Sequence, residues 1–146
     1  MAKRTYETNT IRVLWDSSRC IHTGICLRLG EGAFDRDRRP WVDLSVVDAQ
    51  VVIAAIESCP SGALRYERLD GEPGEQPAEP TTIVPMPNGP LRVRGDFTIE
   101  DRKGQAFEVG PRSTLCRCGA SQNQPFCDNR HRESGFRSVP SASSDD

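Results

Sequence analysis

The sequence predicts an α+β protein made of two small domains, an α/β domain at residues 1–69 and a β-rich domain at residues 81–140. Three observations support this prediction. Residues 70–80 carry four acidic residues and no large apolar side chain, which predicts an extended acidic Pro/Gly linker. On either side of this linker, apolar residues recur with the period of strands or of a helix. The six cysteines divide into two sets of three, one set in each domain.

In the first domain, two strands are predicted around a helix. Ile11, Val13 and Trp15 alternate with polar residues, which indicates a strand over residues 11–15. A second strand is expected at residues 61–66, after the turn that follows Pro60.

The helix of the first domain is predicted from Asp48, a residue type that caps helix N-termini, to Ser58. Its buried face is marked by residues spaced i, i+3, i+4 and i+7, namely Val52, Ala55, Ile56 and Cys59. Cys59 would then end the helix on that face. The spacing alone allows Cys59 to be either a core cysteine or a metal ligand.

The first cysteine set is Cys20-Ile-His22-Thr23-Gly24-Ile-Cys26 together with the remote Cys59-Pro60. Bacterial ferredoxins have a Cys-x2-Cys-x2-Cys run and a distant Cys-Pro. Here the outer two cysteines keep that separation and Thr23 takes the place of the middle one.

With Ala33-Phe34-Asp35, Arg39-Pro40-Trp41 and Cys59-Pro-Ser-Gly-Ala-Leu64, residues 11–68 resemble the divergent single-cluster ferredoxin domain. The resemblance implies a ferredoxin-like α/β fold and an iron–sulfur cluster held by Cys20, Cys26 and Cys59. Three cysteines imply a [3Fe-4S] cluster, or a [4Fe-4S] cluster with another fourth ligand. His22 is the nearest candidate for that ligand, and its alternative roles are a histidine beside the cluster or at the surface.

In the second domain, short strands are predicted over residues 81–115. Leu91 and Val93 alternate with arginines, residues 97–99 alternate again, and a turn at 101–104 precedes a strand at 105–109. Residues 141–146 are expected to form a disordered tail.

The second cysteine set has the spacing Cys116-x-Cys118-x8-Cys127-x3-His131. Thiolate and imidazole are ligands of zinc and of iron–sulfur clusters. With Ser121, Pro125 and Cys127-Asp128, and with residues 88–95 ahead of it, this region resembles the CDGSH domain of mitoNEET-type proteins over residues 81–137. The resemblance implies a β-rich domain with a cluster-binding loop and short helix, and a [2Fe-2S] cluster on Cys116, Cys118, Cys127 and His131. The alternative is a small zinc site.

The chain departs from the family motif at two positions, with Asn129 and Arg130 in place of glycine and serine. Asparagine tolerates a left-handed backbone better than most residues, so we expect the loop to form. Asp128 is expected to cap a short helix through His131, or to be a simple turn residue. Arg130 beside His131 would disfavour protonation of the imidazole.

Composition excludes several classes of protein. The net charge of −2 favours neither a nucleic-acid-binding nor a membrane-surface protein. No apolar segment follows the N-terminal residues and none is long enough to span a bilayer, so we expect a cytoplasmic protein whose reduced cysteines bind metal. Five arginines near the second cysteine set form either solvated surface charge or a basic rim for an acidic redox partner: Arg112, Arg117, Arg130, Arg132 and Arg137.

These features predict a soluble electron-transfer protein with two unlike iron–sulfur clusters, and not an enzyme. A second hypothesis is an iron–sulfur cluster carrier or a redox or pH sensor that uses the histidine-ligated [2Fe-2S] cluster, since histidine can be protonated and lost. A third is a structural zinc protein. The expected partner is a redox protein or an apo iron–sulfur acceptor, and the expected state is a monomer or homodimer.

Overall fold

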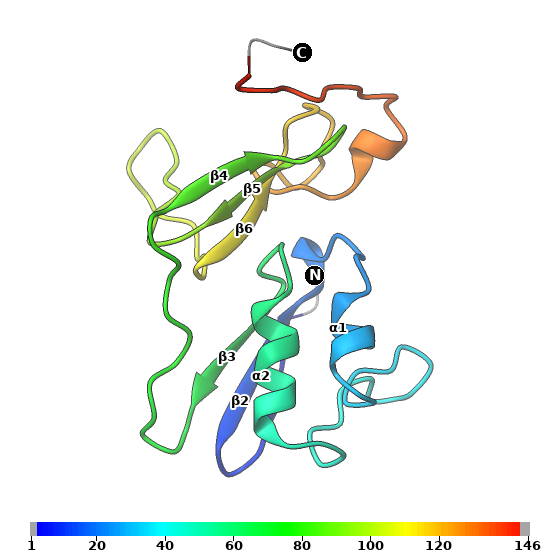
Figure 1. Ribbon diagram of the computed structural model, residues 1–146, viewed down its shortest axis with the longest axis vertical. Helices are drawn as coiled ribbons and strands as arrows, with labels where there is room; N and C mark the ends of the chain where they lie inside the picture. Colours follow the sequence, from blue (N-terminus) through cyan, green and yellow to red (C-terminus); the bar gives the residue numbers. More distant parts are fainter. Residues whose placement is uncertain (1–2, 144–146) are drawn as a thin grey trace. The chain divides into compact units, whose positions relative to one another are not determined.

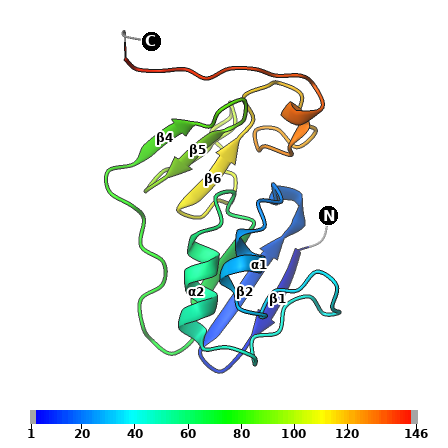
Figure 2. The ribbon, with the colours of Figure 1, turned by 45° about the vertical axis from the view of Figure 1, so that its right-hand side comes forward.

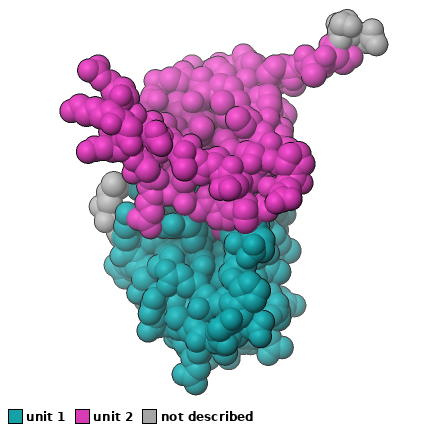
Figure 3. Space-filling view, turned by 90° about the vertical axis from the view of Figure 1, so that its left-hand side faces the viewer, with its two compact units in different colours: residues 1–76 teal, residues 77–146 magenta. Residues whose placement is uncertain are grey.

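The computed structural model describes residues 3–143, and the chain divides into two compact units, residues 1–76 and 77–146 (Figure 3). We call them the N-terminal unit and the C-terminal unit. Their division lies within the segment 70–80. Of the predicted tail, residues 144–146 lie outside the described residues. Each unit has its own three-stranded antiparallel sheet, and with the short helices these make an α+β chain.

The sheet of the N-terminal unit has the order β1-β2-β3 (Figures 1 and 2). The strand predicted at 11–15 is confirmed as β2. The second predicted strand is confirmed as β3, but it begins at Leu64 and not at residue 61, and β1 was not predicted. Along the chain the elements are β1 (Lys3–Glu7), β2 (Ile11–Asp16), the 3-10 helix η1 (Ser17–Arg19), α1 (Ile25–Leu29), α2 (Ala49–Glu57) and β3 (Leu64–Arg68).

Helix α2 follows the predicted pattern. Val52, Ala55 and Ile56 are fully buried and belong to the core of this unit. Asp48 stands at the N-cap position, but its side chain makes no capping hydrogen bond; its carbonyl accepts from the amide of Val51 at 3.0 Å. Cys59 lies just beyond the helix, half-buried against the core, so the helix ends two residues earlier than this cysteine.

The sheet of the C-terminal unit has the order β4-β5-β6. The alternation at Leu91 and Val93 is confirmed as β5. The elements are β4 (Thr82–Pro85), β5 (Leu91–Arg94), β6 (Arg112–Leu115) and the 3-10 helix η2 (Arg130–Arg132).

The strands predicted at 97–99 and 105–109 are wrong. Only an isolated bridge between Glu100 and Ala106 forms there. The predicted turn between them does form, since the Asp101 carboxylate accepts from the amides of residues 103 and 105 at 2.8 and 3.0 Å. The bridge has two backbone hydrogen bonds, from the Asp101 amide to the Gln105 carbonyl and from the Phe107 amide to the Ile99 carbonyl, both at 2.8 Å, and the pairing does not extend into a ladder.

Candidate metal centres

The C-terminal unit brings all four predicted donors of the second set together in two pairs. Cys116 and Cys118 follow β6 directly, and their sulfurs are 3.9 Å apart. Cys127 precedes η2, which carries His131, and the Cys127 Sγ to His131 Nδ1 distance is 3.6 Å.

These spacings suit two metal atoms with one donor pair each. Two donors bound to one tetrahedral metal at ~2.3 Å stand ~3.8 Å apart. A [2Fe-2S] centre has two ligands on each iron, and histidines can replace thiolates on one of them. Within residues 3–143, no three His, Cys, Asp or Glu side chains are close enough to hold a single metal ion. Each donor pair therefore has the spacing of two ligands on one metal atom.

The loop between Cys118 and Cys127 is held by its own hydrogen bonds. The buried Ser121 hydroxyl donates to the Phe126 carbonyl at 2.6 Å and accepts from the Asn123 amide at 3.0 Å. The Cys116 amide donates to the Pro125 carbonyl at 2.8 Å, which ties the loop back to the end of β6. Ser121, singled out in the sequence, thus fixes the separation of the two cysteines on either side of it.

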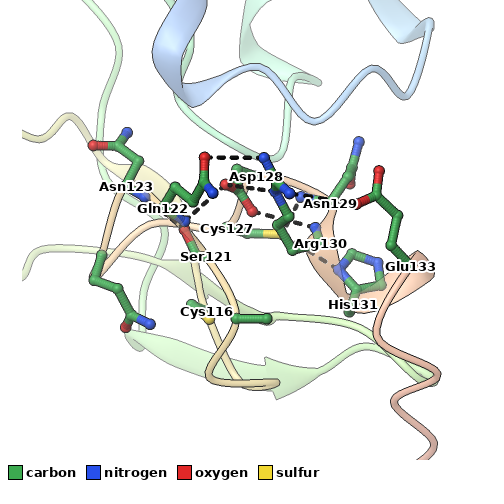
Figure 4. Close-up of polar contacts among 12 residues, drawn as sticks. Cys116, Ser121, Gln122, Asn123, Cys127, Asp128, Asn129, Arg130, His131 and Glu133 are labelled. Carbon is green, nitrogen blue, oxygen red and sulfur yellow. Dashed lines mark hydrogen bonds and ion pairs between the residues drawn. The ribbon is translucent and has the colours of Figure 1, made fainter.

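The segment ahead of His131 differs from the expected helix cap (Figure 4). Asn129, not Asp128, stands at the N-cap of η2, with φ 70° in the left-handed region as predicted. η2 is a single 3-10 turn, too short to present a helix dipole to a ligand. Asp128 instead accepts from the amides of Gln122 at 2.9 Å and Arg130 at 3.2 Å, and so joins the loop to η2.

The five arginines of the supposed basic rim have different roles. Arg112 is buried, at 2% exposure. Arg117 donates four hydrogen bonds within the unit, and Arg130 binds the Gln122 side chain at 2.9 Å. Arg132 and Arg137 line an open hollow of about 450 Å³ together with His131.

The electrostatic environment of His131 also differs from the expectation. Burial lowers the pKa of His131, and the positive charge of Arg132, not of Arg130, lowers this pKa further, against an opposing effect of Asp128. Arg130 is directed to Gln122 and to the carboxylate of Asp128, 3.8 Å away. Both influences on His131 favour the neutral imidazole that a metal ligand requires.

The N-terminal unit brings together the three cysteines of the first set. Cys20 follows η1, Cys26 lies in α1 and Cys59 follows α2. Burial raises the pKa of Cys26 to about 11, and electrostatic repulsion from Cys59 and Cys20 contributes to the rise. The pKa of Cys20 is also raised, by burial first and then by Cys59. Cys20 and Cys26 are therefore both close enough to Cys59 for its charge to act on them.

Cys20 and Cys26 border an open hollow of about 400 Å³, and His22 lies on the same wall. The Cys20 Sγ to His22 Nδ1 distance is 3.7 Å. Aromatic and cationic side chains complete the hollow: Trp15, Trp41, Arg36 and Arg39. The sequence identified the donors but not the side chains around them, because those side chains come from separate segments of the chain.

Comparison with known proteins gives two family matches. Residues 6–69 match the divergent 4Fe-4S mono-cluster family, and residues 88–132 match the family of iron-binding zinc fingers of CDGSH type. The uncharacterized protein YjdI of Escherichia coli K12 is 38% identical over 63 residues, which are 43% of this chain and 83% of YjdI. YjdI of Escherichia coli O157:H7 gives the same figures.

The chain belongs to both families, in this order along the sequence. Its divergent 4Fe-4S mono-cluster domain contains Cys20, His22, Cys26 and Cys59, and its CDGSH domain contains the four donors of the second set. The protein is therefore an iron–sulfur-binding protein. Among residues 3–143, no helix is long and apolar enough to cross a membrane.

The divergent 4Fe-4S and CDGSH domains share one local hydrogen-bond pattern at their cysteines. In each case the amide two residues after a cysteine donates to its sulfur: His22 to Cys20 at 3.3 Å, Ala120 to Cys118 at 3.4 Å and Asn129 to Cys127 at 3.4 Å. An amide that points at a thiolate stabilises its negative charge, and such bonds tune cluster potentials. The positive φ of His22 and of Asn129, 59° and 70°, accompanies two of these turns.

Proposed function

We propose that this protein is an electron carrier with two unlike iron–sulfur clusters, one in each domain. Cys116, Cys118, Cys127 and His131 would hold a [2Fe-2S] cluster. Cys20, Cys26 and Cys59 would hold a [3Fe-4S] cluster, or a [4Fe-4S] cluster if a fourth donor completes the set. When bound, such clusters supply reversible one-electron transfer.

The observation that carries this proposal is that each donor set borders an open hollow. His131 lines one hollow, and Cys20 with Cys26 lines the other. Bound metal would therefore lie close to the protein surface, where electrons can be exchanged with a partner. Neither lining contains a carboxylate that could serve as a general acid or base beside the donors. We therefore include in the proposal that the protein transfers electrons without being an enzyme.

Two arginines stand at each hollow, Arg132 and Arg137 at the first and Arg36 and Arg39 at the second. Like-signed charge around a redox site selects a partner of opposite charge and accelerates its encounter. The partner that fits both hollows is an acidic redox protein. Its electron exchange should slow as ionic strength rises.

The test is an EPR spectrum of anaerobically purified full-length protein, recorded before and after chemical reduction and combined with a redox titration. Two distinct iron–sulfur signals that titrate reversibly are the expected result. A coloured protein whose clusters cannot be cycled without loss would overturn the electron-carrier function. A colourless protein that contains zinc would favour the structural alternative.

A second function is favoured by the position of His131 at an open hollow. An accessible, protonatable ligand suits a cluster that is handed to an apo acceptor or lost as a redox or pH signal. His131→Cys separates the two functions. In a cluster carrier, this change should retain the cluster but abolish transfer to an apo acceptor, whereas in an electron carrier it should mainly lower the potential.

A further inference from the structure

Ser61 lies two residues after the predicted ligand Cys59 and is almost completely buried, at 2% exposure. Its hydroxyl oxygen lies 3.5 Å from the sulfur of Cys59 and 3.1 Å from the amide nitrogen of Ala63. Within residues 3–143, these two atoms are the polar neighbours of the hydroxyl. Because a buried hydroxyl has to form its hydrogen bonds inside the protein, the chemistry of each neighbour determines the direction of each bond.

The contact with Ala63 leaves the hydroxyl proton available. A backbone amide can only donate, so the Ser61 oxygen accepts from Ala63 and keeps its own proton for another acceptor. A cysteine binds metal as a thiolate, which has no proton and can only accept. With metal bound, the Ser61 hydroxyl therefore donates to the sulfur of Cys59.

The turn that carries Ser61 is anchored to the sheet. The carbonyl of Ala63 accepts from the amide of Asp16, the last residue of β2, at 2.8 Å, and Ala63 is buried. A serine that accepts from the amide two residues further on is a common turn-forming residue. Turn formation accounts for the contact of the Ser61 oxygen with Ala63, but it makes no use of the hydroxyl proton. The contact with Cys59 uses that proton.

The sulfur of Cys59 thus has a donor at the same sequence separation as three other cysteine sulfurs. The amides of His22, Ala120 and Asn129 each donate to the sulfur of the cysteine two residues earlier. At Cys59 the residue two positions further on provides a side-chain hydroxyl. A side-chain donor, unlike a backbone amide, can be removed by a single substitution.

We propose that Ser61 raises the reduction potential of the N-terminal cluster by donating a hydrogen bond to Cys59 Sγ. This inference rests on the proposed function, in which Cys20, Cys26 and Cys59 hold an iron–sulfur cluster. The reduced cluster carries one more negative charge than the oxidised one, and a hydrogen bond to a ligating sulfur stabilises that charge. Burial strengthens the effect, because water does not screen a hydrogen bond in the protein interior.

The reduction potential of the N-terminal cluster is the first readout, measured by a redox titration of the full-length protein followed by EPR. Ser61→Ala should shift the reduction equilibrium about threefold to tenfold toward the oxidised form, which is a fall of about 30–60 mV for one electron. Ser61→Thr keeps the hydroxyl and should keep the wild-type potential. Ser61→Cys has a weaker donor and should give a smaller fall, and its comparison with Ser61→Thr decides the question where Ser61→Ala does not hold the cluster.

The proton itself is the second readout. Pulsed EPR of wild-type protein exchanged into D2O should show deuterium coupled to the N-terminal cluster. One of these couplings should be absent from Ser61→Ala and present in Ser61→Thr, whereas a residue that only shapes the turn would change the stability and leave the couplings in place. Ser58→Ala is the matched control, because Ser58 is adjacent to Cys59 but its hydroxyl donates to the Ala54 carbonyl at 2.9 Å. It should leave the potential and the couplings unchanged, as should every variant for the C-terminal cluster.

The failure of this inference is distinguishable from failure of the proposed function. Equal N-terminal potentials and equal deuterium couplings in the wild-type protein and Ser61→Ala would overturn the role of Ser61 and leave the cluster in place. Absence of an iron–sulfur signal from the N-terminal domain of the wild-type protein would overturn the proposed function, and this inference with it.

Discussion

Arg117 lies between two predicted ligands and holds three segments of the C-terminal unit together. Its guanidinium donates to the carbonyls of Met86 and Gly89, both at 2.8 Å, and to the hydroxyl and carbonyl of Ser138 at 2.9 and 3.0 Å. It also stacks on the Phe136 ring, with 4.9 Å between the guanidinium carbon and the ring centre. Arg117→Ala removes all of these contacts at once, and we expect it to loosen the loop that holds Cys116 and Cys118.

The magnitude follows from the four hydrogen bonds. Each contributes about 0.5–1.5 kcal/mol net, and water replaces part of what is lost at this half-buried site, which gives a total of about 2–4 kcal/mol. Because each 1.4 kcal/mol changes an equilibrium constant tenfold, the equilibrium constant for local opening should rise about 30- to 700-fold. If opening limits cluster loss, the visible absorbance of the C-terminal cluster should decay at least about tenfold faster than in the wild-type protein.

The assay is the decay of that absorbance at constant temperature and pH. Arg117→Lys keeps the charge but loses the planar fork, so it should decay at an intermediate rate. Arg102→Ala is the matched control, because Arg102 is an exposed arginine of the same unit in the turn at 101–104. A decay rate of Arg117→Ala within twofold of the wild-type rate would show that this arginine does not hold the cluster loop.

Three further predictions, with their control substitutions, test the loop and the sheet. Asn129→Gly should keep the wild-type rate of cluster loss. Asn129→Val places a β-branched residue at φ 70°, which should destabilise the loop by about 1–2 kcal/mol and accelerate cluster loss about tenfold. Equal rates for the two variants would refute the requirement for a left-handed backbone. Ser121→Ala removes two loop hydrogen bonds and should lower the free energy of unfolding of the holoprotein by about 1–3 kcal/mol. Denaturant titration measures this loss, and an unchanged unfolding midpoint would contradict the prediction. Gly95→Ala would place a Cβ 2.5 Å from the Thr81 Cα at φ 138° and should lower the free energy of unfolding by about 3 kcal/mol in the same titration. Gly104→Ala, which has open space around it, should lower it by only about 1 kcal/mol. Equal losses would exclude the steric clash as the cause.

Local patterns were sufficient to predict the elements with a buried face. Val52, Ala55 and Ile56 are spaced for one side of a helix, and the structure buries all three. In contrast, β1 (Lys3–Glu7) is a mostly exposed edge strand of polar residues and has no apolar alternation. It forms through pairing with β2, supported by the Arg12–Glu7 ion pair at 2.6 Å, and neither contribution is visible in its own five residues.

The cysteine spacings likewise indicated which donors come together, because ligand chemistry restricts both residue type and separation. The residues that support those donors left no such signal. The partners of Arg117 at Met86, Gly89 and Ser138 lie 21 to 31 residues away, so in the sequence it resembles any other surface arginine. The opposite error occurred at residues 97–99, where alternation was present but the pairing with the neighbouring segment stops at the single bridge between Glu100 and Ala106.

The two units differ in how much of their stability their apolar cores can supply. The N-terminal unit has a cluster of ten buried apolar residues that includes Ile11, Ile56 and Leu64. In the described part of the C-terminal unit, the buried hydrophobic residues are Val93, Phe126 and Cys127, and Cys127 is itself a predicted ligand. A buried side chain contributes about 1.5–3 kcal/mol, so the C-terminal core is too small to offset the entropy of ordering its chain. We therefore expect metal binding to supply much of the folding free energy of this unit.

Removal of both clusters from the full-length protein should consequently unfold the C-terminal unit and leave the N-terminal unit folded. Amide hydrogen exchange, read by mass spectrometry before and after anaerobic chelation, measures each unit separately. In the apoprotein, amides of residues 91–94 and 112–115 should exchange at the rate of an unfolded chain, whereas those of 49–57 and 64–68 should stay protected by at least about tenfold. His131→Ala should reproduce the C-terminal loss without chelation, and Cys59→Ala should not. Retained protection at 112–115 in the apoprotein would mean that the sheet stands without its metal, and that the small core holds more free energy than its buried side chains account for.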